Sequence, residues 1–188
     1  MGLKPTRAPI EGLMVVEGPQ YRDNRGYFWE VFNSNTWEAF GLGLTVRQVN
    51  QSGSMKGVVR GLHFQHTPPM GKLMRVTRGA AYLVAVDIRV NSPTLGQWFG
   101  VEATEDNKIQ VWGEAGFARG FCALTDYAEV QYFCTANYSQ TGESGFKWND
   151  PDVGVKWPVD KPIVSAKDDE AQSFKDWLAR PEAQLFKI

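Results

Sequence analysis

Histidine and cysteine are scarce in this 188-residue chain, which contains two of each. Cys122 and Cys134 do not form a Cys-x-x-Cys pair, so their spacing gives no redox motif and no disulfide framework. Both lie in runs of strand-forming residues, where we expect small buried apolar side chains. A metal site built from several converging histidines is out of reach for a chain with two. We therefore expect no bound metal and no cofactor.

Net charge and long apolar runs are also lacking. The formal net charge is −1, whereas a domain that binds nucleic acid usually shows a basic face. No apolar run approaches the ~18 residues of a membrane span, and the first residues lack the apolar stretch of a secretory signal. We therefore expect a cytoplasmic protein that binds neither nucleic acid nor membrane. The length and a hydrophobic content of 43% indicate one globular domain over residues 1–188.

Short runs rich in β-branched and aromatic residues fill the middle of the chain. Turn residues separate them at intervals of roughly 8–12 residues, a pattern that favours a sandwich or barrel. The clearest runs are 58–65, 73–77, 80–89 and 128–135. Two helices are expected, one over 35–40 and one over 168–180. The expected fold is mainly β, a barrel or jelly roll with short helices and a C-terminal helical tail, whose interior can hold one small ligand.

Three chemically reactive side chains occur in or beside these runs. His63 lies in the first, Lys72 directly precedes the second and Tyr132 lies in the last. We expect them on neighbouring strands of one sheet, as a base, a cation and a phenol suited to moving a proton next to a ketone. Two of them have plainer interpretations, a hydrogen-bonded, half-buried histidine and a solvated lysine at a strand edge.

Nine segments, taken in order, carry a family pattern. They are Asp23–Glu30, Gln48–Ser54, Val59–Gln65, Gly71–Val76, Val86–Gly96, Gly116–Phe121, Gln131–Tyr132, Trp148–Pro151 and Ser165–Asp168. Together they resemble the dTDP-4-dehydrorhamnose 3,5-epimerase family, and the resemblance extends from about Gly12 to Asp168. It implies a cupin-type jelly-roll β-barrel and a sugar-nucleotide epimerase that needs no cofactor.

The resemblance implies roles for four catalytic residues. His63 is the base that removes a proton beside the C4 ketone of a dTDP-4-keto-6-deoxyhexose, and Tyr132 is the acid on the opposite face. Lys72 lies near the C4 oxygen. Asp168 orients and charge-balances His63, although in isolation it would be a helix N-cap.

The resemblance also implies which residues bind the nucleotide sugar. Arginine suits the diphosphate because a planar guanidinium matches phosphate oxygens, although a surface ion pair is its commoner role. Tyr138 would stack on the thymine ring. The full set is Arg25, Phe28, Glu30, Gln48, Asn50, Arg60, Arg119, Tyr138, Glu143 and Lys167. A homodimer is implied as well, in which an N-terminal strand crosses to the partner and residues near Arg25 complete the partner's site.

Two residues depart from the family pattern. Where the family usually has Pro-x-Gly-Phe-Ala-His-Gly-Phe, this chain has Glu114 in place of the proline and Arg119 in place of the histidine. Arg119 either faces the sugar and biases which carbon reacts, or turns outward to pair with Glu114. Three alternatives therefore stay open: a 3- or 5-monoepimerase, a 3,4-ketoisomerase on a related nucleotide sugar, and a non-enzymatic sugar-binding cupin. His66, three residues after His63, is expected on the opposite face of its strand.

Overall fold

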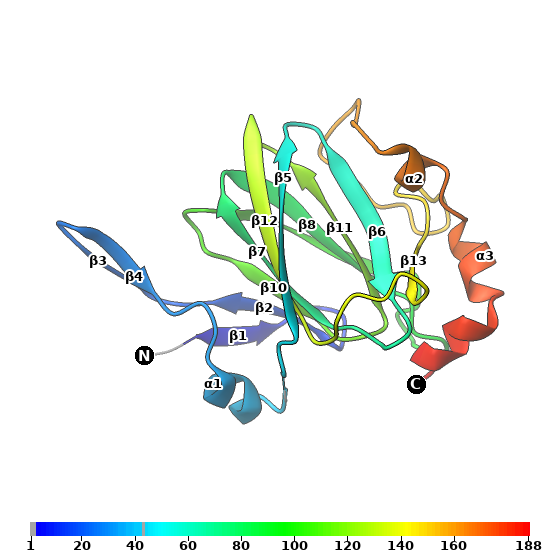
Figure 1. Ribbon diagram of the computed structural model, residues 1–188, viewed down its shortest axis with the longest axis horizontal. Coiled ribbons are helices and arrows are strands. Elements are labelled where there is room, and N and C mark those ends of the chain that lie inside the picture. The colour runs from blue at the N-terminus through cyan, green and yellow to red at the C-terminus, as the bar shows by residue number, and fades with distance from the viewer. Residues whose placement is uncertain (1–2, 43) are drawn as a thin grey trace.

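Two antiparallel sheets form the body of the computed structural model, which describes residues 3–42 and 44–188 (Figure 1). One sheet has six strands in the order β1-β2-β10-β7-β12-β5, and the other has five in the order β13-β6-β11-β8-β9. Strands β3 and β4 pair with each other as a hairpin that projects from the body. This mainly β architecture confirms the expected fold class. That residues 1–188 make one domain stays a prediction.

The elements are short. The strands are β1 (Lys4–Arg7), β2 (Leu13–Glu17), β3 (Gln20–Asp23), β4 (Gly26–Trp29), β5 (Gln48–Met55), β6 (Val59–Gln65), β7 (Lys72–Arg78), β8 (Ala80–Asp87), β9 (Trp98–Thr104), β10 (Gln110–Gly113), β11 (Phe117–Ala123), β12 (Tyr127–Cys134) and β13 (Glu143–Gly145). The helices are α1 (Ser34–Ala39), α2 (Ala166–Asp169), α3 (Phe174–Leu178) and the 3-10 helix Pro181–Phe186. None of the helices in the described part of the chain has the length and apolar character needed to cross a membrane.

Apolar side chains from both sheets fill the space between them. This cluster consists of Met74, Val76, Ala81, Leu83, Ala103, Val111, Phe121 and Val130. Leu73 points the other way and packs with Trp37 of α1. Because successive residues of a strand point to opposite faces, Lys72 shares the inner face with Met74, and Tyr132 shares it with Val130.

The C-terminal segment covers the outer face of the five-stranded sheet (Figure 1). Leu62 and Phe64 of β6 pack there, and the ring centroids of Phe64 and Trp177 are 4.4 Å apart. Since both neighbours of His63 point outward, His63 points inward. The ring of buried His66 lies 5.8 Å from that of Trp177. His66 is therefore on the outer side, which confirms that the two histidines face opposite ways.

Two short helices replace the continuous helix expected over 168–180. Helix α2 ends at Asp169, and α3 begins only after Ser173, which forms a capping box with Asp176. Between them, Gln172 Nε2 donates to Ser144 Oγ at 3.0 Å and to the Gly145 carbonyl at 2.9 Å. These local bonds give the backbone an alternative to the helix, and apolar spacing alone does not reveal them.

Candidate active site

The structure places the three reactive residues on two sheets and not on one. His63 belongs to β6 in the five-stranded sheet, whereas Lys72 on β7 and Tyr132 on β12 belong to the six-stranded sheet. The expectation of neighbouring strands in one sheet is therefore wrong, because a run's side-chain pattern gives its burial and not its pairing partner. All three side chains still point into the space between the sheets, the histidine from one side and the other two from the opposite side.

Asp168 holds the imidazole of His63. Its Oδ1 lies 2.5 Å from His63 Nε2, and its Oδ2 accepts the N–H of Gly61 at 3.4 Å. Asp168 is buried, whereas the side chain of His63 is 40% exposed. Burial raises the pKa of Asp168, but the hydrogen bonds from His63 and Gly61 outweigh burial and hold that pKa below its usual value. A charged carboxylate thus fixes one ring nitrogen, and the other is available to take a proton.

The N-cap interpretation of Asp168 is wrong. Ser165 caps α2, and its Oγ accepts the N–H of Asp168 at 3.2 Å. Asp168 lies inside the helix, so its side chain is free to reach His63.

Gly61 brings β6 close to β11. Its φ is +127°, and a β carbon there would lie 2.7 Å from Gly120 Cα and 2.9 Å from the Arg119 carbonyl oxygen. A larger residue would meet both strain and collision. The pairing of the two strands shifts at this point, and Arg119 stands opposite His63 in the register.

The pKa values of Tyr132 and Lys72 are shifted in opposite directions. The phenol of Tyr132 is hydrogen-bonded to Ser52 Oγ on β5. Burial raises the pKa of Tyr132, so the phenol keeps its proton at neutral pH and can donate it. Burial, followed by the charge of Arg119, lowers the pKa of Lys72 to about 8.

A cavity of about 220 Å³ opens beside His63 and Asp168. Glu143 and Lys167 also line it, and their side chains form an ion pair of 2.5 Å. The structure therefore brings these two predicted binding residues to the catalytic pair. Within the described ranges, no group of three or more His, Cys, Asp and Glu side chains is arranged to hold a metal ion. That activity needs no metal stays a prediction.

Other predicted binding residues lie along β5 and its neighbours. Gln48 Oε1 accepts the N–H of Tyr138 at 2.7 Å, and Gln48 Nε2 donates to Asn50 Oδ1 at 2.8 Å. Asn50 stands opposite Tyr132 in the register. Tyr138 is 55% exposed, so its ring is at the surface and not in the core. Arg60 Nη2 donates to the Gly53 carbonyl of β5 at 3.2 Å.

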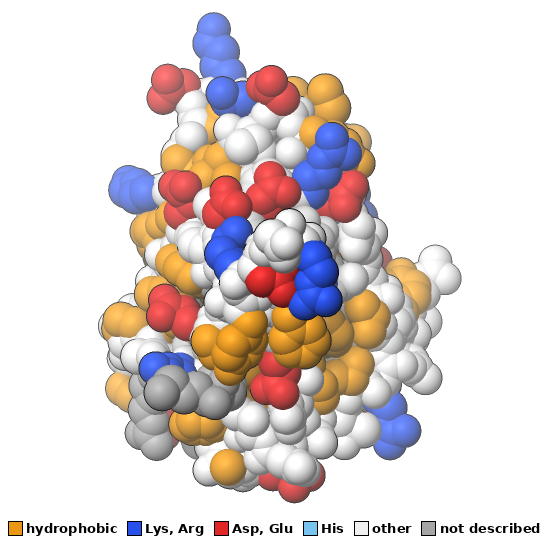
Figure 2. Space-filling view, turned by 90° about the vertical axis from the view of Figure 1, so that its left-hand side faces the viewer, with side chains coloured by type: hydrophobic (Ala, Val, Ile, Leu, Met, Phe, Trp, Pro, Cys, Tyr) orange, Lys and Arg blue, Asp and Glu red, His pale blue; other side chains and the backbone are white. Residues whose placement is uncertain are grey.

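Arg25, Phe28 and Glu30 are not brought to His63 within one chain. The β3–β4 hairpin projects from the body (Figure 1). Arg25 lies in the turn of this hairpin and pairs with Asp23 at 2.6 Å. Phe28, on the same hairpin, is 69% exposed. Figure 2 looks onto this end of the molecule, where hydrophobic side chains reach the surface beside charged ones. Glu30 follows the hairpin and accepts a hydrogen bond from Asn33 at 2.9 Å.

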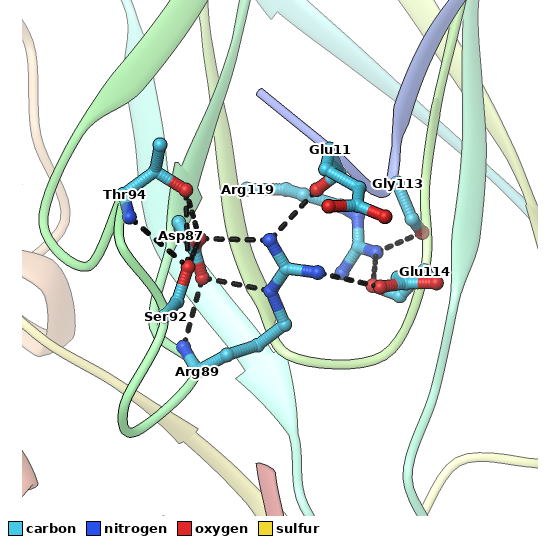
Figure 3. Close-up of polar contacts among 8 residues, drawn as sticks. All are labelled: Glu11, Asp87, Arg89, Ser92, Thr94, Gly113, Glu114 and Arg119. Atoms are coloured by element: carbon cyan, nitrogen blue, oxygen red, sulfur yellow. Dashed lines mark hydrogen bonds and ion pairs between the residues drawn. The ribbon is translucent and has the colours of Figure 1, made fainter. Parts of the chain in front are cut away.

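Arg119 is buried and does not turn outward (Figure 3). Its Nη1 donates to the Phe117 carbonyl at 2.7 Å, and its Nη2 donates to the carbonyls of Gly113 and Glu114. The carboxylate of Glu114 instead accepts from Arg89 Nη1 at 2.8 Å. The outward ion pair between Arg119 and Glu114 is therefore not formed.

Two supporting residues were missed by sequence reasoning. One is Ser52, which binds the Tyr132 phenol. The other is buried Gln65, whose Nε2 donates to the carbonyl of Asn137 at 3.1 Å and whose Oε1 accepts from Ser139 N at 2.8 Å. Gln65 thereby fixes the loop that carries Tyr138. Both lie in segments of the family pattern, but a polar residue in a strand does not reveal its partner.

In the described site, His63, held by the Asp168 carboxylate, faces inward from one sheet, and Lys72 and Tyr132 face inward from the other. The family follows from comparison with known proteins, since the family model for dTDP-4-dehydrorhamnose 3,5-epimerase matches residues 7–176. The chain belongs to the dTDP-4-dehydrorhamnose 3,5-epimerase family, and it is an isomerase of that family.

Individual relatives agree with this family. The dTDP-4-dehydrorhamnose 3,5-epimerase of Methanothermobacter thermautotrophicus is 45% identical over 165 residues, which are 86% of this chain and 89% of the relative. The crystal structure of the Legionella pneumophila dTDP-6-deoxy-D-glucose-3,5-epimerase in complex with dTDP-4-keto-L-rhamnose is 38% identical, covers 96% of each chain and has a TM-score of 0.91. A dTDP-4-dehydrorhamnose 3-epimerase of Streptomyces niveus is 37% identical over 164 residues, which are 86% of this chain and 79% of the relative.

Proposed function

We propose that this protein inverts the carbons beside the C4 ketone of a dTDP-4-keto-6-deoxyhexose, with His63 as base and Tyr132 as acid. The observation that carries the proposal is His63, which faces inward from one sheet and is held by Asp168 of α2, with Tyr132 on the facing sheet. Inversion needs proton removal on one face of the sugar and delivery on the other. A ring bound between the sheets would present its two faces to these two residues.

Lys72 would stabilise the enolate. A proton beside a ketone is far too weakly acidic for imidazole unless the negative oxygen that forms is stabilised, and a preorganised donor is worth about 3 kcal/mol. As His63 takes the proton, the C–H electrons form the enolate double bond and charge moves to the C4 oxygen, beside Lys72. Tyr132 then gives its proton to the same carbon from the other face.

The nucleotide part would bind outside this catalytic group. Arg25 and Arg60 are candidates for charge recognition, Tyr138 for stacking on the thymine, and Phe28, Glu30, Gln48, Asn50, Glu143 and Lys167 for further contacts. The exposed β3–β4 hairpin supports a homodimer in which Arg25 and Phe28 serve the partner's site. The proposal includes a cytoplasmic location and no cofactor.

A monoepimerase is the second candidate. One observation favours it: Arg119 stands opposite His63 where the family pattern has histidine, and one relative is named as a 3-epimerase. Arginine is bulkier than histidine, and opposite His63 its side chain would restrict the sugar to one reacting carbon. A 3,4-ketoisomerase and a sugar-binding cupin stay alternatives for the same test.

The deciding experiment is incubation with dTDP-4-keto-6-deoxyglucose in deuterated water. Deuterium at C3 and C5 supports double epimerisation, and deuterium at one carbon supports the monoepimerase. An isomerised keto group points to the ketoisomerase, and binding without exchange points to the sugar-binding cupin.

The matched variant is His63→Asn. It should fold and bind dTDP but lose exchange at the sugar carbons by ~10²–10⁴-fold or more. Wild-type exchange in this variant would rule out His63 as the base.

A further inference from the structure

Arg119 carries a buried charge with only neutral acceptors. Arg119 is 4% exposed, and its guanidinium donates to the backbone carbonyls of Phe117, Gly113 and Glu114. In the described part of the chain, its Nε has no hydrogen-bond partner. Burial lowers the pKa of Arg119 to about 9, which still leaves it charged at neutral pH. A buried cation without a carboxylate partner is costly, so its retention calls for a physical reason.

The turn that holds Arg119 is itself fixed by an ion network in which Asp87 and Arg89 are buried and Glu114 is partly exposed (Figure 3). The Glu114 carboxylate accepts from Arg89 Nη1, and Arg89 Nη2 donates to Asp87 Oδ2, each at 2.8 Å. Asp87 is fully buried and also accepts from the hydroxyls of Ser92 and Thr94 at 2.6 Å each. Arg119 is therefore bound to carbonyls that have little freedom to move.

Gly113 connects Arg119 to Lys72. A β carbon at Gly113 would lie 3.1 Å from Arg119 Nη2, and Gly113 is the register partner of Lys72. Opposite residues of an antiparallel pair have β carbons about 4.5–5.5 Å apart. The guanidinium of Arg119 therefore lies on the inner face of β10, the strand that pairs with Lys72 of β7.

Little negative charge opposes Arg119 around Lys72. The groups that face Lys72 are Arg119 on β11, Cys134 on β12 and Glu143 on β13, with His63 and Tyr132 also directed inward. Burial raises the pKa of Cys134, which keeps its thiol neutral at neutral pH. The Glu143 carboxylate is engaged by Lys167 at 2.5 Å. Among these groups, Arg119 is the cation that lies beside Lys72 without a carboxylate partner, and its charge lowers the pKa of the lysine.

We propose that Arg119 is a positioning residue that acts through Lys72, a fixed cation that makes the charged state of the lysine depend on an anionic oxygen between the sheets. The inference rests on the proposed function, because the enolate oxygen would be that anion. Without it, two like charges lie near each other and the pKa of the lysine is lowered. When the oxygen becomes negative, both cations gain a partner. Arg119 does this without touching the substrate.

The test is an NMR titration of Lys72 in protein labelled with ¹³C at lysine Cε, with Lys72→Arg to assign the signal. We expect wild-type Lys72 to titrate near pH 8, against about 10.4 for an ordinary lysine. Arg119→Gln should raise the midpoint by about one pH unit. Arg119→Lys keeps the positive charge, so its midpoint should stay close to the wild-type value. Arg78→Gln is the control, because Arg78 is an exposed arginine on the same strand as Lys72 and should leave the midpoint unchanged.

Three results would overturn the inference: a wild-type midpoint near 10.4, no shift in Arg119→Gln, or an equal shift in Arg119→Lys. If Arg119→Gln does not fold, Arg119→His gives the same test, since imidazole is neutral over this range. The titration needs no substrate, so absent deuterium exchange would defeat the proposed function and leave this result standing. With active enzyme, the alkaline limb of kcat should move upward in Arg119→Gln along with the Lys72 midpoint.

Discussion

Asp168→Asn removes the negative charge of the side chain and keeps nearly the same shape. The two oxygens of Asp168 serve two donors, His63 Nε2 at 2.5 Å and Gly61 N at 3.4 Å. An amide has one acceptor oxygen, so it can satisfy only one of them. If the oxygen stays with Gly61, the amide NH₂ faces His63 and forces its proton onto the other ring nitrogen. That nitrogen is the one that must accept the substrate proton, so the base is blocked.

The expected loss is therefore that of a general base, about 10²–10⁴-fold in deuterium exchange at the sugar carbons. Binding of dTDP, measured by calorimetry, should change little, because Asp168 lies beside the base. Asp169→Asn is the matched control. Asp169 is the next residue of the same helix, is exposed and accepts one long hydrogen bond of 3.5 Å from Trp148. Equal exchange rates for Asp168→Asn and wild type, or an equal loss in the control, would refute the reasoning.

The same variant has a stability signature. A charge-assisted hydrogen bond is worth about 1.5–3 kcal/mol, and the lower end applies because His63 is 40% exposed. The folded-state pKa of Asp168 lies below its usual value, so the stabilisation is present above about pH 4. It is lost as the pH falls through the folded-state pKa. The difference in unfolding free energy between wild type and Asp168→Asn should therefore shrink in acid.

Four further outcomes are expected. Tyr132→Phe removes the phenol that binds Ser52; exchange should survive in part while inverted product falls sharply, and product at the normal rate would assign the acid elsewhere. Prolonged chelation should leave activity intact, and activity restored by a divalent ion would contradict this. Sedimentation should show a homodimer, and an active monomer would contradict this prediction. Asp87→Asn should destabilise the protein by about 3–5 kcal/mol in chemical denaturation, because it leaves buried Arg89 poorly paired.

Strand positions were predictable because their signal is local. The four runs expected from the sequence match β6, β7, β8 and β12 to within two residues at each end, as does the first helix with α1. Alternation also predicted that His63 and His66 face opposite ways. The assignment of strands to sheets was not predictable, since the contacts between β6, β7 and β12 depend on pairing across the chain. The tail helix failed for a related reason: Gln172 and Ser173 form bonds that the apolar spacing does not show.

The candidate site was predictable as a set of residues but not as a geometry. His63 and Asp168 meet as expected, and Glu143 and Lys167 line the cavity beside them. The sequence did not indicate that Ser52 would bind the phenol, nor that Arg119 would bind carbonyls. Each of these depends on side-chain contacts between strands distant in sequence, which no residue pattern records.

Glu114 and Arg119, the two departures from the family pattern, are structurally connected. Proline lacks an N–H and a polar side chain, and Glu114 uses both: its N–H donates to the Gly12 carbonyl at 3.2 Å and its carboxylate binds Arg89. The carbonyl of the same residue accepts from Arg119. The glutamate therefore adds bonds that fix the turn, and the turn supplies the acceptors for the arginine. A buried cation needs such a fixed set of acceptors, because its desolvation cost is offset only by well-placed dipoles. Changing either residue alone should therefore weaken the placement of the other.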